Sequence, residues 1–231
     1  MGQPRGQASP SQEAALHAFR QHYAARDARA DLNGDGVINI ADLAALKQRW
    51  SPATAKVSGG EVFVSAQPLQ AQGIVGAPVV IDLTLDFTAE PTLGGAVDVT
   101  LDPALTGDVS WTYATSNLGD DPFFRNPPDI TPGRITGITV GSFDGLTGPG
   151  VIGSVVLIPT QAASGSVTPG ASALSPWVAD GTFEIQSPTY TASTLTVSDA
   201  AAVPISPMAL ALGFGALLCI GAWTQRARSP A

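Results

Sequence analysis

The clearest structural pattern in this sequence lies in Val79-Val-Ile-Asp-Leu-Thr-Leu-Asp-Phe87. Its apolar side chains recur at every second position, and Asp or Thr stands at most of the positions between them. This period of two is typical of a β-strand with one buried face. Similar patterns recur along the chain at 61–66, 95–101, 108–114, 134–140, 151–158, 182–186 and 193–198.

Turn-forming pairs separate these runs, among them Gly94-Gly95, Pro132-Gly133 and Pro149-Gly150. Short strands with no helical pattern between them favour a mainly β fold. We therefore predict a sandwich of two sheets with about nine strands, of jelly-roll or immunoglobulin-like type, over residues 53–202. Apolar residues make up 44% of the chain, which is enough for the core of such a domain.

Residues 1–52 are predicted to be helical instead. The segment Ser9-Pro-Ser-Gln12 matches an N-cap, a proline at the first helical position and a capping-box glutamine. The apolar residues that would share one face of this first helix are Leu16, Phe19 and Tyr23. A second, shorter helix is expected over about 42–50, with Ser51-Pro52 ending it.

Charge and composition exclude several classes of function. The formal net charge is −8, and residues 57–204 contain two basic residues against 14 carboxylates. Such a surface repels phosphate backbones, so we expect no nucleic-acid partner. Both histidines, His17 and His22, lie near the start, and Cys219 is the one cysteine, so most of the chain lacks the residues for Ser-His, Cys-His or His-metal chemistry.

Residues 31–42 carry the sequence's most specific motif, Asp-Leu-Asn-Gly-Asp-Gly-Val-Ile-Asn-Ile-Ala-Asp. Oxygen-bearing side chains occupy loop positions 1, 3, 5, 9 and 12, namely Asp31, Asn33, Asp35, Asn39 and Asp42. Gly36 at position 6 allows a sharp turn, and Val37 at position 7 would offer its backbone carbonyl. Calcium takes about six to eight oxygen ligands, and this spacing wraps them around one point. We predict an EF-hand-like calcium site; an Asn- and Asp-rich turn without metal is the alternative.

Position 12 of this loop is Asp42, where EF-hands ordinarily have glutamate. The segment 31–47 in this respect resembles a single type I dockerin repeat, in which the calcium loop ends in aspartate and leads directly into a helix. The resemblance implies calcium ligation by the six residues Asp31, Asn33, Asp35, Val37, Asn39 and Asp42. Dockerins normally carry two such repeats, and this sequence has one. Ile40 and Ala41 replace the Ser or Thr that usually contacts a cohesin, which leaves partner recognition open.

Two segments of the β region resemble cohesins. Residues 94–105, Gly-Gly-Ala-Val-Asp-Val-Thr-Leu-Asp-Pro-Ala-Leu, are similar to a cohesin strand that ends in an Asp-Pro turn. Residues 133–140 and 146–157 are similar to a later pair of cohesin strands. The resemblance implies a nine-stranded jelly roll without catalytic residues that binds a dockerin or a related protein. A generic sandwich, including a carbohydrate-binding one, fits the pattern nearly as well.

Residues 203–231 resemble a C-terminal sorting tail of the PEP-CTERM type. Residues 208–223 form an uncharged run of 16 residues, followed by Arg226 and Arg228. As a helix this run would be about 24 Å long, slightly short of a bilayer core of about 30 Å. We expect a transmembrane helix; a core helix packed on the sandwich is the alternative. The resemblance implies a protein of the bacterial cell envelope or the extracellular space, anchored at its C-terminus before possible processing. Because no apolar core follows Met1, the export signal is expected upstream.

Three functions remain open. The favoured one is a non-catalytic, calcium-binding adhesion or scaffold module with a cohesin- or dockerin-type protein partner, associated with polysaccharide-degrading assemblies. The second is a glycoside hydrolase or its accessory part, which would need paired carboxylates; the candidates are Asp120, Asp121, Asp129 and Asp144. The third is a carbohydrate-binding module with an aromatic platform; the candidates are Trp111, Tyr113, Phe123, Phe124, Trp177 and Tyr190.

Overall fold

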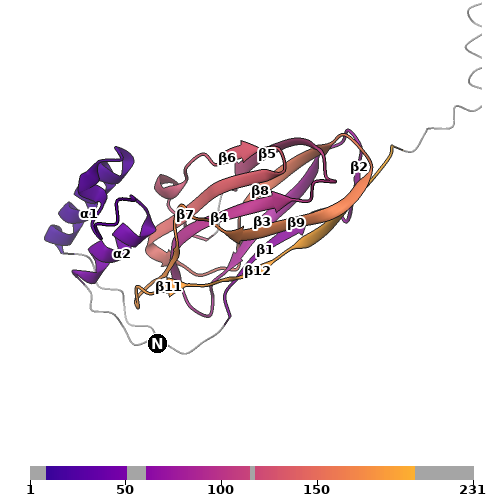
Figure 1. Cartoon of the computed structure of the whole chain (residues 1–231). Helices are drawn as coiled ribbons and strands as arrows, with labels where there is room; N and C mark the ends of the chain where they lie inside the picture. The colour runs from indigo at the N-terminus through magenta and orange to yellow at the C-terminus, as the bar shows by residue number, and fades with distance from the viewer. Residues whose placement is uncertain (1–8, 51–60, 115–117, 201–231) are drawn as a thin grey trace, which may run out of the picture. The chain divides into compact units, whose positions relative to one another are not determined.

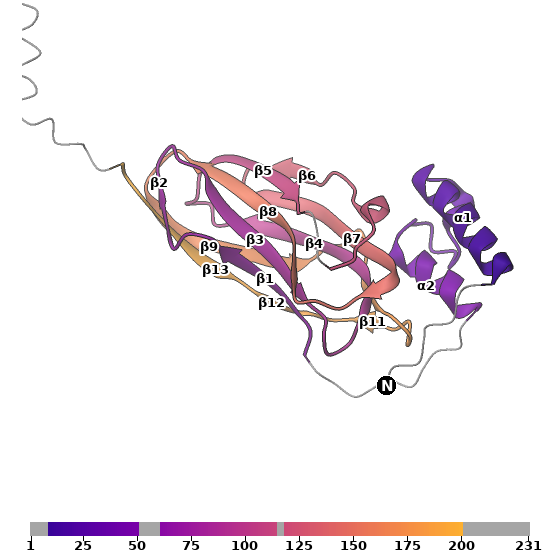
Figure 2. The ribbon, with the colours of Figure 1, turned by 180° about the vertical axis from the view of Figure 1, so that it is seen from behind.

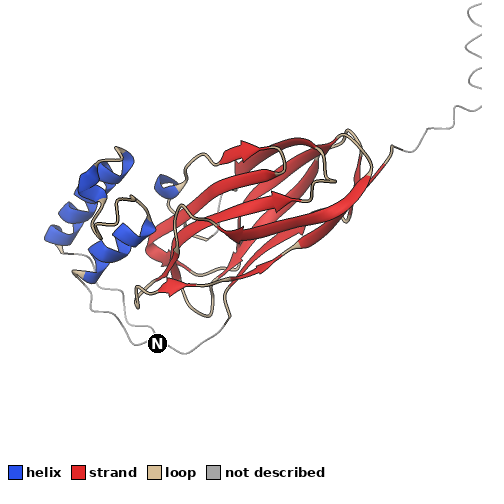
Figure 3. Ribbon diagram, in the orientation of Figure 1, coloured by secondary structure: helices blue, strands red, loops and turns tan. Residues whose placement is uncertain are grey.

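Two β-sheets packed face to face, preceded by two α-helices, make up the described part of the chain (Figures 1 and 3). The structure is a computed structural model, and it describes residues 9–50, 61–114 and 118–200. The elements up to Asp199 belong to one compact unit. The mainly β sandwich predicted from the alternating pattern is therefore present, with more strands than the nine expected: the described residues contain 13.

The first sheet has five strands in the order β12-β1-β3-β8-β5 (Figure 2). Their bounds are Thr189–Thr191 for β12, Phe63–Pro68 for β1, Val79–Asp86 for β3, Gly150–Pro159 for β8 and Gly107–Tyr113 for β5. Strand β3 lies at the centre and pairs antiparallel with both β1 and β8. Residues of β3 alternate between buried and half-buried along its whole length, as the period of two predicts.

The second sheet has eight strands, with the path β11-β10-β4-β9-β13-β2 and two further strands, β7 and β6, joined to it through β4. The path strands are Ile185–Gln186 (β11), Trp177–Ala179 (β10), Thr92–Leu101 (β4), Ala163–Ala171 (β9), Ser193–Ser198 (β13) and Gln72–Ile74 (β2). The joined strands are Arg134–Leu146 (β7) and Asp129–Thr131 (β6). Nearly every residue of β4 is buried, because β7, β9 and β10 pair with it and the other sheet covers its inner face.

The main core lies between the two sheets. Its side chains come from alternate positions of the central strands, including Ile81, Leu83, Leu85, Val97, Val99, Ile138, Val155 and Leu157. Phe87, at the end of β3, is fully buried and its ring lies 4.9 Å from that of Trp177. Burial of this much apolar surface is the dominant favourable term in folding.

Strand β9 was not predicted, because its sequence Ala-Ser-Gly-Ser-Val-Thr-Pro-Gly-Ala has no apolar alternation. It is a strand because β4 and β13 pair with it on its two sides. The predicted strand 182–186 is wrong over most of its length. Phe183 adopts a left-handed conformation with φ of 60°, which turns the chain and leaves Ile185–Gln186 as β11.

The two α-helices are α1 (Pro10–Ala24) and α2 (Ile40–Gln48), with short 3₁₀ turns at Ala28–Ala30 and Pro122–Phe124. Ser9 caps α1, and Gln12 completes the capping box as predicted. Helix α2 begins two residues earlier than expected because Asn39 is its N-cap and accepts a hydrogen bond from the Ala41 amide. The predicted tail, 203–231 with its helix 208–223, lies outside the described residues, and none of the helices that are described is long and apolar enough to cross a membrane.

Replacing Ile81 with Ala is expected to lower the free energy of unfolding by about 2–5 kcal/mol, because the side chain is 1% exposed and its removal leaves a cavity. Urea unfolding followed by circular dichroism measures the loss. Ile185→Ala is the matched control: that side chain is 71% exposed, and its change should stay within about 0.5 kcal/mol. Equal losses at both positions would contradict the assigned core.

Candidate metal centre

The loop 31–42 folds around the carboxylate of Asp31. Its Oδ1 accepts hydrogen bonds from the amides of Gly34 (2.8 Å) and Asp35 (3.2 Å), and its Oδ2 accepts one from Gly36 (2.9 Å). Gly34 and Gly36 have φ of 77° and 83°, a region that glycine adopts without steric cost. The two glycines therefore let successive amides point inward at one carboxylate.

Asn33 and Asp35 lie beside Asp31 and bind each other. The Asn33 side-chain amide donates to Oδ2 of Asp35 (2.9 Å), and Oδ1 of Asp35 accepts from the Val37 amide (2.8 Å). The side chain of Val37 is 47% exposed. Residues 33–37 thus form the solvent-facing half of the loop, and Val37 has no side-chain atom that binds a cation.

Asn39 and Asp42 form the buried half of the loop and also cap α2. Asp42 is 0% exposed; its Oδ1 accepts from the amides of Leu32 (2.7 Å) and Asn33 (3.3 Å), and its Oδ2 accepts from Asn39 (2.8 Å). This single carboxylate ties the start of the loop to its end. The structure therefore brings Asp31, Asn33 and Asp35 together directly and connects Asp42 to them through backbone amides.

The chemical type of the side chains suits a hard cation such as calcium, since each of them offers an oxygen atom as ligand. An ionised carboxylate has about four lone-pair sites. Three hydrogen bonds occupy Asp31, three occupy Asp42 and two occupy Asp35, so each keeps at least one site for a cation. In the described ranges, however, no three His, Cys, Asp or Glu side chains gather closely enough to hold a metal ion. A bound ion would thus need the amide and carbonyl oxygens as well.

Burial raises the pKa of the Asp42 carboxyl above its ordinary value. The hydrogen bonds from the Asn39, Leu32 and Asn33 amides oppose this rise, and the negative charge of Asp31 adds to it. A positive ion in the loop would favour the charged form of Asp42 and offset the cost of its burial.

The helices and this loop pack on the sandwich through a second apolar cluster. Phe124 is its centre: the ring is 1% exposed and lies 5.5 Å from Tyr23 and 4.8 Å from Phe143. The helical element and the sandwich both contribute buried members, which are Phe19, Tyr23, Ala30, Ile40, Leu43, Ala44, Leu46, Leu93, Phe124, Phe143 and Val178. The helical element is therefore docked on its own sandwich, within one chain.

Polar contacts surround this cluster. Arg20 forms an ion pair with Asp121 (3.1 Å), and its guanidinium lies 4.1 Å from the centre of the Phe143 ring. On the other side, Lys47 forms an ion pair with Asp180 (2.8 Å) and donates to the Phe143 carbonyl (3.0 Å). These ion pairs could not be predicted from the sequence, because their partners lie 101 and 133 positions apart.

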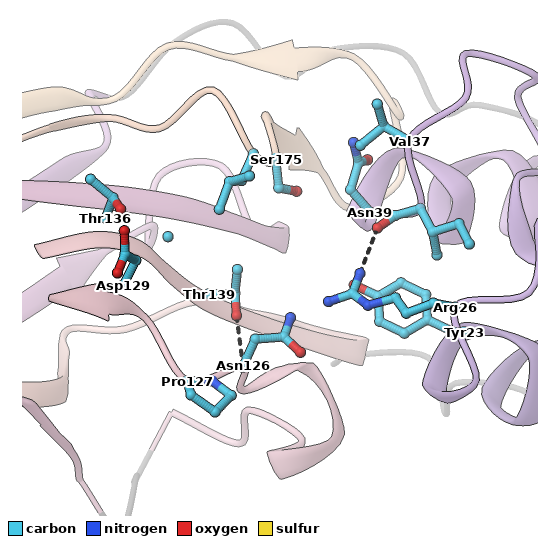
Figure 4. A pocket seen from close by; sticks show the side chains of 13 residues that line it. Tyr23, Arg26, Val37, Asn39, Asn126, Pro127, Asp129, Thr136, Thr139 and Ser175 are labelled. Atoms are coloured by element: carbon cyan, nitrogen blue, oxygen red, sulfur yellow. Dashed lines mark hydrogen bonds between the residues drawn. The ribbon is translucent and has the colours of Figure 1, made fainter.

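A pocket of about 270 Å³ lies between the loop and the sandwich (Figure 4). Tyr23, Arg26, Val37 and Asn39 line it from the helical element, and the sandwich contributes Asn126, Pro127, Asp129, Thr136, Thr139 and Ser175. Arg26 donates to the carbonyl of Ile38 (3.1 Å), directly after loop position 7. Arg26 has a φ of 52°, the left-handed conformation that the residue after a helix often adopts. Glycine usually occupies such a position, so the arginine gave no indication of it in the sequence.

Of the six candidate aromatic residues, Phe123 and Phe124 do not form an exposed platform. Both rings pack in the docking cluster, Phe124 is buried, and Phe123 lies 5.2 Å from Tyr23. Three of the candidate catalytic carboxylates have separate contacts. Asp120 pairs with Arg125 (2.8 Å) and Asp121 with Arg20, while Asp129 lines the pocket beside the loop.

No protein-family model and no curated protein matches the sequence. Solved structures similar to this chain are cohesin modules. A cohesin from a cohesin–dockerin complex of Clostridium thermocellum is 8% identical (TM-score 0.47) and matches over 60% of this chain and 100% of its own length. A non-cellulosomal cohesin of Archaeoglobus fulgidus is 13% identical, with a TM-score of 0.42, and matches over 60% of this chain and 92% of its own length. A cohesin module of a Clostridium perfringens family 33 glycoside hydrolase is 9% identical, with a TM-score of 0.43, and matches over 61% of this chain and 100% of its own length.

Gly141→Ala is expected to loosen the docked helical element. A Cβ at this position would lie 2.7 Å from the Ile40 Cδ1 and 2.8 Å from the Phe124 ring, so the cluster must shift. We expect a loss of about 1–3 kcal/mol in the free energy of unfolding and faster amide hydrogen exchange in α1 and α2.

Gly170→Ala is the matched control, because a Cβ there meets no atom within 4 Å. It should be neutral or slightly stabilising, since alanine restricts the unfolded chain. Unchanged exchange in α1 and α2 of Gly141→Ala would show that the cluster does not hold the helical element.

Proposed function

We propose that this protein is a non-catalytic interaction module whose helical element binds calcium and which serves adhesion or scaffolding. The observation that supports it is the loop 31–42, in which three carboxylates keep lone-pair sites free while backbone amides fix their positions. Asp31, Asn33, Asp35, Asn39 and Asp42 would hold the ion through their side chains and Val37 through its carbonyl. When bound, the ion supplies positive charge to a group of acidic side chains and orders the loop.

Because the helical element packs on the sandwich, calcium binding in the loop would also affect the stability of the rest of the molecule. Helix α2 begins directly at the loop, and its residues Ile40, Leu43 and Leu46 are buried in the docking cluster. An ion that stabilises the loop therefore stabilises the surface that the helices and the sandwich form together. A helical element of this size has too little core to fold well alone, so its stability depends on that surface.

The partner that we propose is a protein of cohesin or dockerin type, as the resemblances of residues 31–47 and 94–105 imply. The net charge of −8 disfavours a nucleic acid. We further propose that residues 203–231 anchor the protein at the bacterial cell envelope and that the module serves assemblies that degrade polysaccharides.

Calcium is expected to bind the full chain at one site and to raise its free energy of unfolding. A ligand at a hundred times its dissociation constant adds about 2.7 kcal/mol. Isothermal titration calorimetry and thermal unfolding with and without chelator measure the two effects. Asp35→Asn should weaken binding by at least about tenfold, because it removes one negative charge and keeps the oxygen that accepts from Val37.

Asp108→Ala is the control for overall charge, since this exposed acidic residue lies on β5, outside the loop. It should leave calcium affinity unchanged. If Asp31→Ala combined with Asp35→Ala bound calcium like the unmodified chain, the proposed site would be excluded.

Binding of a purified dockerin- or cohesin-bearing protein to the immobilised chain is expected to depend on calcium. Surface plasmon resonance in the presence of calcium or of chelator measures it, with Asp35→Asn as the variant that should lose the dependence. Equal binding with calcium and with chelator would show that partner binding does not depend on the calcium loop.

A further inference from the structure

A second cavity, of about 290 Å³, lies where the edge strands of the two sheets meet. Its lining comes from β10, β11, β12 and the segment between β11 and β12, together with Ala96 and part of the segment 171–176. Its lining residues include Trp177, Gln186 and Tyr190. Gly95 on β4 makes room for the indole, since a Cβ there would lie 2.5 Å from the Trp177 ring.

Three polar atoms of these lining residues are buried, and none of them makes a hydrogen bond of standard geometry within the described residues. They are the indole Nε1 of Trp177, the side-chain Oε1 of Gln186 and the hydroxyl of Tyr190. Trp177 and Gln186 are 3% and 7% exposed. A buried polar group without a well-formed hydrogen bond is destabilising, so three around one cavity point to a ligand that pairs with them.

The hydrogen-bonding roles of two of these atoms are fixed. The Gln186 amide nitrogen donates to the Glu90 carbonyl (3.0 Å), so its Oε1 is the atom left as acceptor. The Trp177 indole can only donate, and the Tyr190 hydroxyl can do both. A ligand must therefore offer a donor and an acceptor close together, which is the chemistry of a hydroxyl group.

The remaining lining excludes a charged ligand. None of the eleven residues that line the cavity is charged; they are Ala96, Ala171, Ser172, Ser175, Pro176, Trp177, Ile185, Gln186, Ser187, Pro188 and Tyr190. Burial raises the pKa of the Tyr190 hydroxyl, a weak side-chain hydrogen bond with the Trp177 indole opposes this rise, and the charge of Asp98 adds to it. An ion placed here would lie without a counter-charge.

We propose that this cavity binds one sugar unit of a neutral glycan. Its hydroxyls would accept from the Trp177 indole, donate to the Gln186 oxygen and pair with the Tyr190 hydroxyl. Its C–H faces would pack on the apolar walls that Pro176, Pro188 and Ile185 provide. This site is separate from the calcium loop and gives the module a second, direct contact with polysaccharide.

The test is a titration of the full chain with cellobiose, xylobiose and N,N′-diacetylchitobiose, and with glucuronate as the charged comparison. The indole N–H resonance of Trp177, identified by its loss in Trp177→Phe, is followed in ¹H–¹⁵N spectra. We expect a saturable shift with at least one neutral disaccharide at about 10 mM, which detects millimolar affinity, and none with glucuronate.

Tyr190→Phe should weaken this binding by about two- to tenfold, because it removes one hydrogen bond and keeps the ring. Gln186→Met, which removes the acceptor, should act in the same direction. Tyr113→Phe is the matched control: its hydroxyl donates to the Asn126 carbonyl (2.7 Å), and its loss should change melting temperature but not affinity. If the Gln186→Met variant does not fold, the sugar affinity of Tyr190→Phe alone tests the proposal.

Absence of a saturable shift with all three neutral sugars would overturn the proposal, as would a shift that both variants leave unchanged. Calcium binding does not enter this experiment, so either result leaves the proposed function of the loop unaffected.

Discussion

The packing of Phe124 against Tyr23 and Phe143 is the contact on which the rest of this arrangement depends. It joins helices that lack a sufficient core of their own to a sandwich that has one. Gly141 permits this contact, since the Ile40 side chain and the Phe124 ring occupy the space where a Cβ would stand. A ring pair of this kind adds about 0.5–1.5 kcal/mol beyond the area it buries, and here it also fixes the orientation of the loop.

Asp42 carries that constraint into the loop. Its carboxylate accepts hydrogen bonds from the amides of Leu32, Asn33 and Asn39. It lies in the first turn of a helix whose residues Ile40, Leu43, Ala44 and Leu46 are in the docking cluster. The same carboxylate therefore closes the loop, caps the helix and faces the charge of Asp31. Any ion that binds beside it acts on the loop, on α2 and on the docked surface together, because the three share this one group.

Ser175 connects the two proposed sites. Its hydroxyl accepts from the Ile40 amide (3.3 Å), and its residue lines both the pocket beside the loop and the neutral cavity at Trp177. The segment 171–176 is thus a shared wall, with an acidic loop on one side and an uncharged cavity on the other. The two sides differ in their polar groups: the loop keeps the carboxylates of Asp31 and Asp35 near water, whereas the cavity keeps amide, indole and hydroxyl groups away from it.

The strands with strict alternation, the capping box at Ser9 and the turn at the loop glycines could be predicted from the sequence, because each depends on neighbours within a few positions. Even there it missed β9, whose small residues become a strand only between β4 and β13. Tertiary structure alone decided that Phe123 and Phe124 are covered by helices, that Lys47 meets Asp180, and that Trp177, Gln186 and Tyr190 share a cavity. These groups come from distant parts of the chain, and no local period encodes a contact that only folding creates.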